Sequence, residues 1–185
     1  MEAVITKHFG DKILFDNFTL SLPDKGITLL KGSSGCGKTT LLRILAYLEP
    51  NEKGSLGDFL NKRCSFVFQE PRLIEHYSAT ENLLLVNSDR GKIGDLLEEV
   101  GLKRDDDTPV SKYSGGEKAR VAILRSLLFD ADFYLFDEPF NGLDSRNKKI
   151  IGAMINRELS TKPILLVTHI KDDSELFEIK KVIEL

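Results

Sequence analysis

The 185-residue sequence lacks the features that mark several other classes of protein. No apolar run approaches the ~18 residues that a membrane helix needs, and no basic-then-apolar signal segment opens the chain. The two cysteines, Cys36 and Cys64, lie far apart without metal-site spacing. A net charge of -3 gives no sign of nucleic-acid binding. We therefore expect a cytoplasmic chain that has no nucleic-acid partner and meets a membrane only through another protein.

The bulk composition is that of an ordinary globular protein. Apolar residues make up 41% and charged residues 30% of the chain. A chain of this length can bury a substantial core. We therefore expect one domain over residues 1–185.

The most informative stretch has the phosphate-loop pattern G-x-x-x-x-G-K-[ST] at every fixed position. It reads Gly32-Ser33-Ser34-Gly35-Cys36-Gly37-Lys38-Thr39. The apolar segment 26–31 before it predicts a buried strand, and apolar residues at helical spacing from Leu41 to Leu48 predict a helix that ends before Pro50. A strand, a glycine-rich loop and a helix in this order are typical of a polyphosphate site. The alternative is a surface loop that matches by chance.

The chemistry of this stretch suits phosphate. Its glycines let successive backbone N–H groups point inward, and the helix start adds partial positive charge. Lys38 is placed to reach the β- and γ-phosphates, and the Thr39 hydroxyl to ligate Mg²⁺. Cys36 is a small residue that fits the loop; a redox-sensing role for it is the less favoured alternative.

The rest of the chain predicts alternating strands and helices. We expect further strands at 3–7, 17–22, 64–68, 133–139, 164–168 and 181–185, helices within 78–100, 115–128, 144–159 and 175–177, and polar loops at 50–62 and 105–109. The run of three aspartates at 105–107 is interpreted as exposed loop and not as a metal site.

A second helix start also has anion-binding character. Ser114 and Glu117 have capping-box spacing ahead of an apolar helix, but a cap does not explain Gly115 and Gly116, which weaken the first turn. Glycines fit there if something approaches the backbone closely, and exposed N–H groups suit an anion. The chain therefore carries two candidate phosphate-binding helix starts.

Two acids follow the segment 133–136, whose apolar residues predict an inner strand of a parallel sheet. The carboxyl end of such a strand opens beside the phosphate loop, so Asp137 is placed to hold Mg²⁺ through water and Glu138 to polarise an attacking water. The alternative is that both acids form a helix cap or a salt bridge.

Three isolated residues each allow two interpretations. Gln69 and His169 end predicted strands, where they could face a nucleotide or its γ-phosphate, although such residues are more often structural or simply exposed. Phe9 precedes the turn Gly10-Asp11 and is either a core residue or an aromatic surface for a base.

Together these residues resemble the ATP-binding cassette (ABC) ATPases, the engines of ABC transporters, over essentially the whole chain. The matching motifs are the phosphate loop ending at Thr39, the Q-loop Gln69, the signature Ser114-Gly115-Gly116-Glu117, the Walker B pair Asp137-Glu138, the D-loop Gly142-Leu143-Asp144 and the switch His169. A signature between Gln69 and Asp137 is specific to this class. Glu117 and Phe9 replace the family's usual glutamine and tyrosine.

The resemblance implies an α/β fold of the P-loop NTPase type, with a mostly parallel central sheet flanked by helices. It also implies an antiparallel N-terminal β part and a helical subdomain at about 70–114 inserted between core segments 1–69 and 115–185. The chain is shorter than most of the family between Gly54 and Cys64, so we expect a reduced β part.

The resemblance implies ATP as substrate and Mg²⁺ as cofactor, with each ATP held between two head-to-tail subunits. It assigns catalysis to Glu138, His169 and Lys38, the metal to Thr39, Gln69 and Asp137, and nucleotide binding to Phe9, Gly32, Ser33, Ser34, Gly35, Cys36, Gly37, Lys38, Thr39, Thr40, Gln69, Ser114, Gly115, Gly116 and Glu117.

The implied partners are a second cassette, a membrane permease whose coupling helix meets the helices within 78–100, and a solute-binding protein. The chain would then lie on the inner face of the cell membrane, and the segment 66–73 looks most like importers of the nitrate, sulfonate and taurine group. The alternatives are a soluble ABC ATPase without a transporter and a non-catalytic, nucleotide-dependent interaction module.

Overall fold

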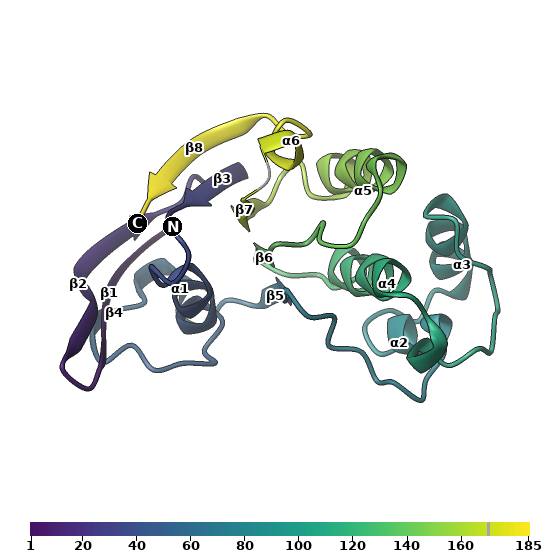
Figure 1. Ribbon diagram of the computed structural model, residues 1–185, viewed down its shortest axis with the longest axis horizontal. Coiled ribbons are helices and arrows are strands. Elements are labelled where there is room, and N and C mark those ends of the chain that lie inside the picture. The colour runs from purple at the N-terminus through teal and green to yellow at the C-terminus, as the bar shows by residue number, and fades with distance from the viewer. Residues whose placement is uncertain (170) are drawn as a thin grey trace.

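The computed structural model describes residues 1–169 and 171–185 as two sheets with helices around them (Figure 1). The strands are β1 Glu2–Phe9, β2 Lys12–Ser21, β3 Gly26–Lys31, β4 Lys53–Ser55, β5 Cys64–Val67, β6 Phe133–Asp137, β7 Pro163–Val167 and β8 Ile179–Glu184. The helices are α1 Lys38–Leu45, α2 Ala79–Leu84, α3 Arg90–Glu99, α4 Gly115–Leu128, α5 Ser145–Glu158 and α6 Lys171–Ser174.

The larger sheet is parallel throughout, in the order β5-β6-β7-β3-β8. Every residue of β6 and β7 is buried, as expected for strands that are apolar on both faces. Alternate residues of β6 enter two different cores: Phe133 and Leu135 pack on the α1 side, and Tyr134 and Phe136 pack on the side of α4 and α5. The expected α/β fold with a parallel central sheet is confirmed.

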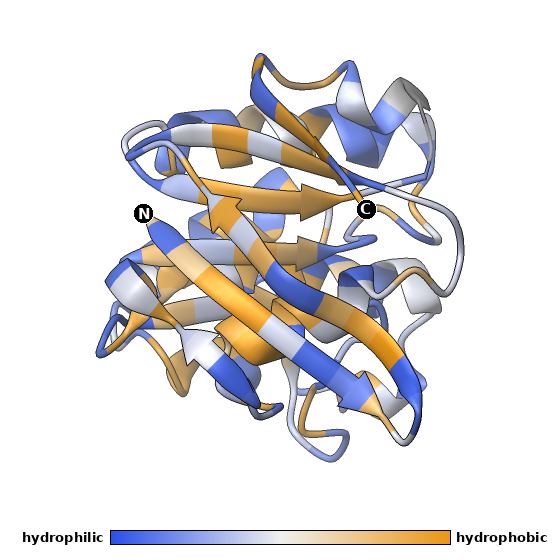
Figure 2. Ribbon diagram, turned by 90° about the vertical axis from the view of Figure 1, so that its left-hand side faces the viewer, coloured by the Kyte–Doolittle hydropathy of each residue, from blue (hydrophilic) through white to orange (hydrophobic). Residues whose placement is uncertain are grey.

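The smaller sheet is antiparallel, in the order β2-β1-β4, and its strands cross in front of the parallel strands in Figure 2. The expectation of loop throughout 50–62 is wrong in part, because β4 and a 3₁₀ turn at Gly57–Phe59 lie there. A β-carbon on Gly54 would lie 2.3 Å from the Val4 carbonyl oxygen, so only glycine lets this short strand pair with β1.

The segment between β5 and α4 is helical, with α2 and α3 on the right of Figure 1. Apolar side chains of both helices, including Leu83, Ile93 and Leu97, share one core with α4. The Arg157 guanidinium also binds the Glu99 carboxylate through two 3.0 Å hydrogen bonds, which joins α5 to α3. None of the helices in 1–169 and 171–185 is long and apolar enough to cross a membrane.

Two helix boundaries predicted from the sequence are wrong, and the predicted strands 17–22 and 133–139 are instead β2 Lys12–Ser21 and β6 Phe133–Asp137. The helix after the phosphate loop ends at Leu45, and Leu48 is 49% exposed, because Tyr47 adopts a left-handed backbone (φ 59°) and turns the chain away. The last helix precedes the predicted 175–177: α6 ends at Ser174, and the N–H groups of Leu176 and Phe177 make i→i−3 turn bonds instead.

Candidate active site

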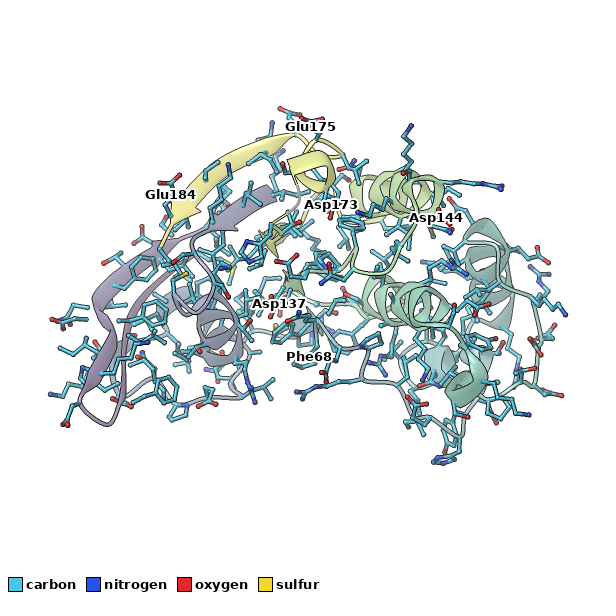
Figure 3. All side chains as sticks on the ribbon, in the orientation of Figure 1. Phe68, Asp137, Asp144, Asp173, Glu175 and Glu184 are labelled. Atoms are coloured by element: carbon cyan, nitrogen blue, oxygen red, sulfur yellow. The ribbon has the colours of Figure 1, made fainter. Side chains whose placement is uncertain are left out.

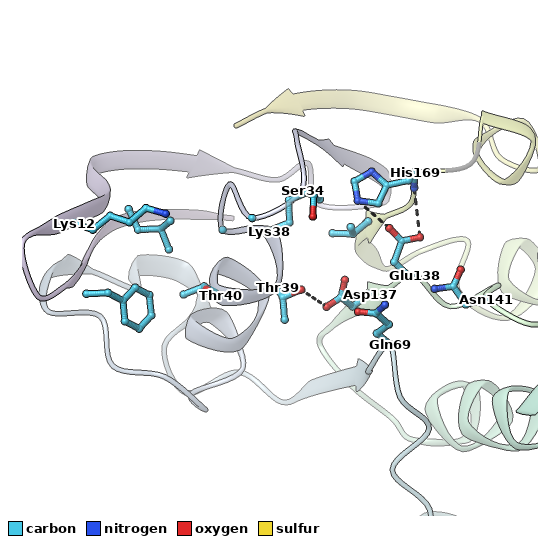
Figure 4. A pocket seen from close by; sticks show the side chains of 15 residues that line it. Lys12, Ser34, Lys38, Thr39, Thr40, Gln69, Asp137, Glu138, Asn141 and His169 are labelled. Atoms are coloured by element: carbon cyan, nitrogen blue, oxygen red, sulfur yellow. Dashed lines mark hydrogen bonds and ion pairs between the residues drawn. The ribbon is translucent and has the colours of Figure 1, made fainter.

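A cleft of about 540 Å³ opens at the carboxyl ends of β3, β6 and β7 (Figure 4). Its walls come from the phosphate loop, the start of α1, the ends of β6 and β7, and the β1–β2 hairpin. The lining residues are Phe9, Lys12, Leu14, Ser34, Gly35, Gly37, Lys38, Thr39, Thr40, Gln69, Asp137, Glu138, Asn141, Val167 and His169. Ligands commonly bind at this edge of a parallel sheet because the loops diverge there.

The phosphate loop curls tightly before α1. Gly37 has a φ of 107° and no room for a β-carbon, which would lie 2.9 Å from the Phe15 ring. No side chain caps this helix start, so the first-turn N–H groups are available to an anion. Lys38 is only 7% exposed, and its ammonium group donates to the carbonyl oxygens of Gly32 at 2.9 Å and Ser33 at 2.8 Å.

Not every loop residue reaches the cleft. Gly32, Ser33 and Cys36 are absent from its lining and support the loop from behind. The Cys36 sulfur lies 3.8 Å from the Lys38 ammonium nitrogen, and a β-carbon on Gly32 would come within 2.6 Å of that sulfur. These three residues therefore shape the loop and hold the lysine.

Thr39 and Asp137 bring two oxygen donors together. The Thr39 hydroxyl donates to the Asp137 carboxylate at 2.7 Å. Burial raises the pKa of Asp137, and the hydrogen bond from Thr39 opposes this shift. Carboxylate and hydroxyl oxygens are ligands that Mg²⁺ accepts, and Gln69 adds an amide oxygen to the same wall. No group of three or more histidine, cysteine, aspartate or glutamate side chains that could hold a metal ion occurs within 1–169 and 171–185, so a magnesium ion here would complete its shell with phosphate oxygens and water.

Glu138 has a strained backbone and a partly unsatisfied carboxylate. Its φ is 51°, which is uncommon for a residue other than glycine, and its N–H donates to the Val167 carbonyl oxygen at 3.0 Å. The Oε1 atom is buried without a hydrogen-bond partner. Burial raises the pKa of this carboxyl group. A carboxylate with a free lone pair at a cleft wall can accept a proton from water.

His169 stands over Glu138 at the end of β7 (Figure 4). Its Nε2 lies 3.4 Å from Glu138 Oε1, and its backbone N–H donates to Oε2 at 3.4 Å. The side chain is 54% exposed, so it is not a packed structural histidine. The ring therefore contacts the carboxylate and remains open to the cleft.

The start of α4 is built differently. The Ser114 hydroxyl oxygen accepts from the Glu117 N–H at 3.3 Å, and the Ser114 N–H donates to the Glu117 carboxylate at 2.8 Å, so the expected capping box is confirmed. The Ser114 hydrogen bonds lower the pKa of Glu117. None of these four signature residues lines the 540 Å³ cleft. Gly115 borders a smaller cavity of about 140 Å³ that it shares with Gln69 and Glu138.

Sequence reasoning missed Lys12, Leu14, Asn141 and Val167 as lining residues. Lys12 and Leu14 alternate along the first half of β2, which the period-two pattern placed only from residue 17 onward. Phe9 was singled out and does line the cleft; it is 51% exposed, and the Lys7 ammonium nitrogen lies 5.0 Å from its ring centre. It is therefore not a core residue.

Known proteins share both the sequence and the fold of this chain. The family model described as "ABC transporter" matches residues 15–141. The aliphatic sulfonates import ATP-binding protein SsuB 1 of Pseudomonas savastanoi is 38% identical over an alignment of 173 residues, and the match covers 91% of this chain and 73% of the relative. The lipoprotein-releasing system ATP-binding protein LolD of Leptospira interrogans is 33% identical, over 91% of this chain and 81% of the relative.

A solved structure agrees with these relatives. The dimeric post-hydrolysis state of the ATP-binding cassette MJ0796, bound to ADP and Pi, superposes with a TM-score of 0.78 at 25% identity. The match covers 100% of this chain and 94% of that one. With the phosphate loop, Asp137, Glu138 and His169 in one cleft, the chain belongs to the ABC transporter family, as an ATP-binding subunit with ATPase activity.

Proposed function

We propose that this chain hydrolyses ATP in its cleft as the ATPase subunit of an ABC importer. The convergence of Lys38, Thr39, Asp137, Glu138 and His169 on one cleft is the observation that carries this proposal. The relatives named for the import of aliphatic sulfonates and of Fe(3+) ions support the direction of transport. Sulfonate-type solutes are the favoured cargo, because three of the first four relatives carry that name.

The phosphates of ATP would bind the uncapped N–H groups at the start of α1. Lys38 would turn its ammonium group from the two loop carbonyl oxygens toward the β- and γ-phosphates. Thr39, Gln69 and Asp137 would hold Mg²⁺, which would neutralise charge on the phosphate oxygens. The exposed Phe9 ring would stack on the adenine base at the far wall.

Glu138 would act as the general base for the attacking water. Its free, buried Oε1 can accept the proton, and its raised pKa brings its basicity closer to neutral pH. The His169 imidazole, 3.4 Å from the same oxygen, would orient the carboxylate and contact the γ-phosphate. Lys38 would stabilise the negative charge that develops during phosphoryl transfer.

A second copy or a related cassette would complete the site. The capped start of α4 offers N–H groups to an anion, yet it lies outside the cleft of its own chain. The dimeric state of MJ0796 supports the pairing of two such subunits. In this proposal Ser114, Gly115, Gly116 and Glu117 of one subunit face the phosphate loop of the other.

The segment 70–114 would form the helical subdomain that receives a permease. In this proposal α2 and α3 meet the permease's coupling helix, and the chain sits on the inner face of the cell membrane. A solute-binding protein would deliver the cargo on the other side. Co-purification with a membrane permease tests this part, because a soluble ABC ATPase would bring none with it.

The variant Glu138→Gln tests the catalytic assignment. It should keep ATP binding and lower turnover of the permease-bound enzyme by ~10²–10⁴, because it removes the base without changing the shape of the side chain. Glu178→Gln is the matched control, since Glu178 is exposed and lies outside the cleft. Near-normal turnover in Glu138→Gln would remove Glu138 from this role. ATP binding without hydrolysis by the assembled wild type would favour an interaction module.

A further inference from the structure

A buried carboxylate near the cleft has no part in the mechanism above. Asp173, in α6, is 1% exposed and lies between α5 and α6 in Figure 3. Its Oδ1 accepts a hydrogen bond from the Lys148 ammonium group at 2.7 Å, and its Oδ2 accepts one from the Thr168 hydroxyl at 3.3 Å. Burying a carboxylate this fully is costly unless it is paired and hydrogen-bonded, and these two donors supply both.

The two partners come from the two segments that carry the proposed catalytic pair. Thr168 directly precedes His169 at the end of β7. Lys148 lies in the first turn of α5, and its N–H bonds to the carbonyl oxygen of Asp144, the cap of that helix. The segment from β6 to this cap contains Glu138. Asp173 therefore links the segment that carries His169 to the segment that carries Glu138. This link is separate from the contact between the two side chains.

We propose that Asp173 is a positioning residue for His169. Its ion pair with Lys148 and its hydrogen bond from Thr168 fix the backbone on which the imidazole stands, so that Nε2 stays 3.4 Å from the Glu138 carboxylate. Movement of Thr168 away from α6 would remove one of the two hydrogen-bond donors of this buried carboxylate, so the pair of contacts favours one geometry. The role of this geometry in turnover rests on the proposed function.

A double-mutant cycle between Asp173 and His169 distinguishes a positioning role for Asp173 from a purely structural one. In the permease-bound enzyme, Asp173→Asn should lower kcat by ~10–10², the usual cost of a small misplacement in an active site, and leave the KM for ATP within about threefold. In a His169→Ala background the same change should lower kcat no further, because the residue it acts through is gone. An equal fall in both backgrounds, or an unchanged kcat in the first, overturns the proposal.

Variants of Lys148 provide the same test from the other side of the ion pair. Lys148→Met should reproduce the loss seen with Asp173→Asn, and Lys148→Arg should retain most of the activity because it keeps a cation at the carboxylate. Lys149→Met is the matched control, since Lys149 is the next residue on the same helix and is exposed. It should leave kcat unchanged. If Asp173→Asn does not fold, Lys148→Met replaces it in the cycle.

A second readout needs no hydrolysis and can be made on the isolated chain. The sequence has three histidines, His8, His76 and His169, so NMR resolves one ring signal for each. In Asp173→Asn or Lys148→Met the Hε1 signal of His169 should shift, and those of His8 and His76 should stay in place. An unmoved His169 signal overturns the positioning role. If the wild type hydrolyses no ATP with its permease, the proposed function fails, while this measurement still decides how the ring is held.

Discussion

The glycine-bearing helix starts of α1 and α4 have opposite constructions. The start of α1 follows Gly37, has no side-chain cap and opens into the 540 Å³ cleft. The start of α4 has both hydrogen bonds of a capping box, from Ser114 and Glu117, and lies outside that cleft. Both present backbone N–H groups, but only the first opens into the cleft that Lys38, Glu138 and His169 line.

The two helix starts differ in how their backbone N–H groups are satisfied. An uncapped helix start inside a cleft leaves N–H groups that a bound anion satisfies. A capped start is stable without a ligand, and a β-carbon on Gly115 would meet no atom within 4 Å, so neither the first turn nor packing requires glycine at this position. The comparison supports a site in which one copy supplies the cleft and another supplies the capped helix start.

Removing the charge at the α1 start should have the largest effect. Lys38→Ala should weaken ATP binding by the isolated chain by up to ~10²-fold, because a hydrogen bond to a charged group is worth up to ~3 kcal/mol and each 1.4 kcal/mol is tenfold. Calorimetric titration with Mg-ATP measures the affinity. Lys31→Ala is the control, since Lys31 is exposed and directly precedes the loop. An affinity within a few-fold of wild type contradicts the phosphate-loop assignment.

A methyl group at the α4 start should have a smaller effect and a more selective one. A β-carbon on Gly115 meets no atom within 4 Å, so Gly115→Ala should raise the free energy of unfolding by about 0.4–1 kcal/mol. If a partner's nucleotide must approach this backbone, the same methyl group should lower turnover ~10-fold or more while the isolated chain binds ATP normally. Thermal unfolding, titration and ATPase rates of the assembled enzyme separate the three effects.

Gly116, the next residue, should respond in the opposite direction when it is replaced by alanine. A β-carbon on Gly116 would lie 2.7 Å from the Gly142 carbonyl oxygen, so Gly116→Ala should destabilise the fold by ~1–3 kcal/mol. If Gly115→Ala keeps full turnover in the assembled enzyme, the α4 start does not approach a nucleotide. In that case only Gly116 would have a structural reason to be glycine.

The smallest expected effect is on the thermal stability of the folded chain, through the charge of Glu138 in the cleft. Because burial raises the pKa of Glu138, ionisation of its carboxyl group costs more free energy in the folded chain than in the unfolded chain. This cost is absent below the ordinary pKa of 4.5, grows as the pH rises from 4.5 to the folded-state pKa, and is complete above that pKa. Glu138→Gln should therefore raise Tm by a few degrees at pH 7–8, since ~1 kcal/mol shifts Tm by ~2–4 °C in a domain of this size.

The gain should shrink as the pH falls toward 4.5. Thermal unfolding followed by circular dichroism at several pH values measures it. Glu178→Gln should give no gain, because Lys180 lowers the pKa of Glu178 and its charge is favourable in the folded chain. A Glu138→Gln gain that is independent of pH would assign the effect to packing instead of charge.

The sequence by itself determined the features that depend on neighbouring residues. The capping boxes at Ser78 and Ser114, the turn at Gly10-Asp11 and the buried strand β6 all lie where local patterns predicted them. Their hydrogen bonds and burial follow from residues two to four positions apart, so a short window of sequence contains the physical cause.

Only the tertiary structure decided the features that join distant residues. The strand β4 exists because Gly54 lets it approach Val4, and no local pattern marks three exposed residues as a strand. Lys12 enters the cleft wall through the path of the β1–β2 hairpin. Asp173 is an ordinary aspartate in sequence and acquires its buried partner Lys148, 25 positions away, only when α5 and α6 pack together. Burial and long-range pairing give these residues their chemistry, and neither is encoded in a local window.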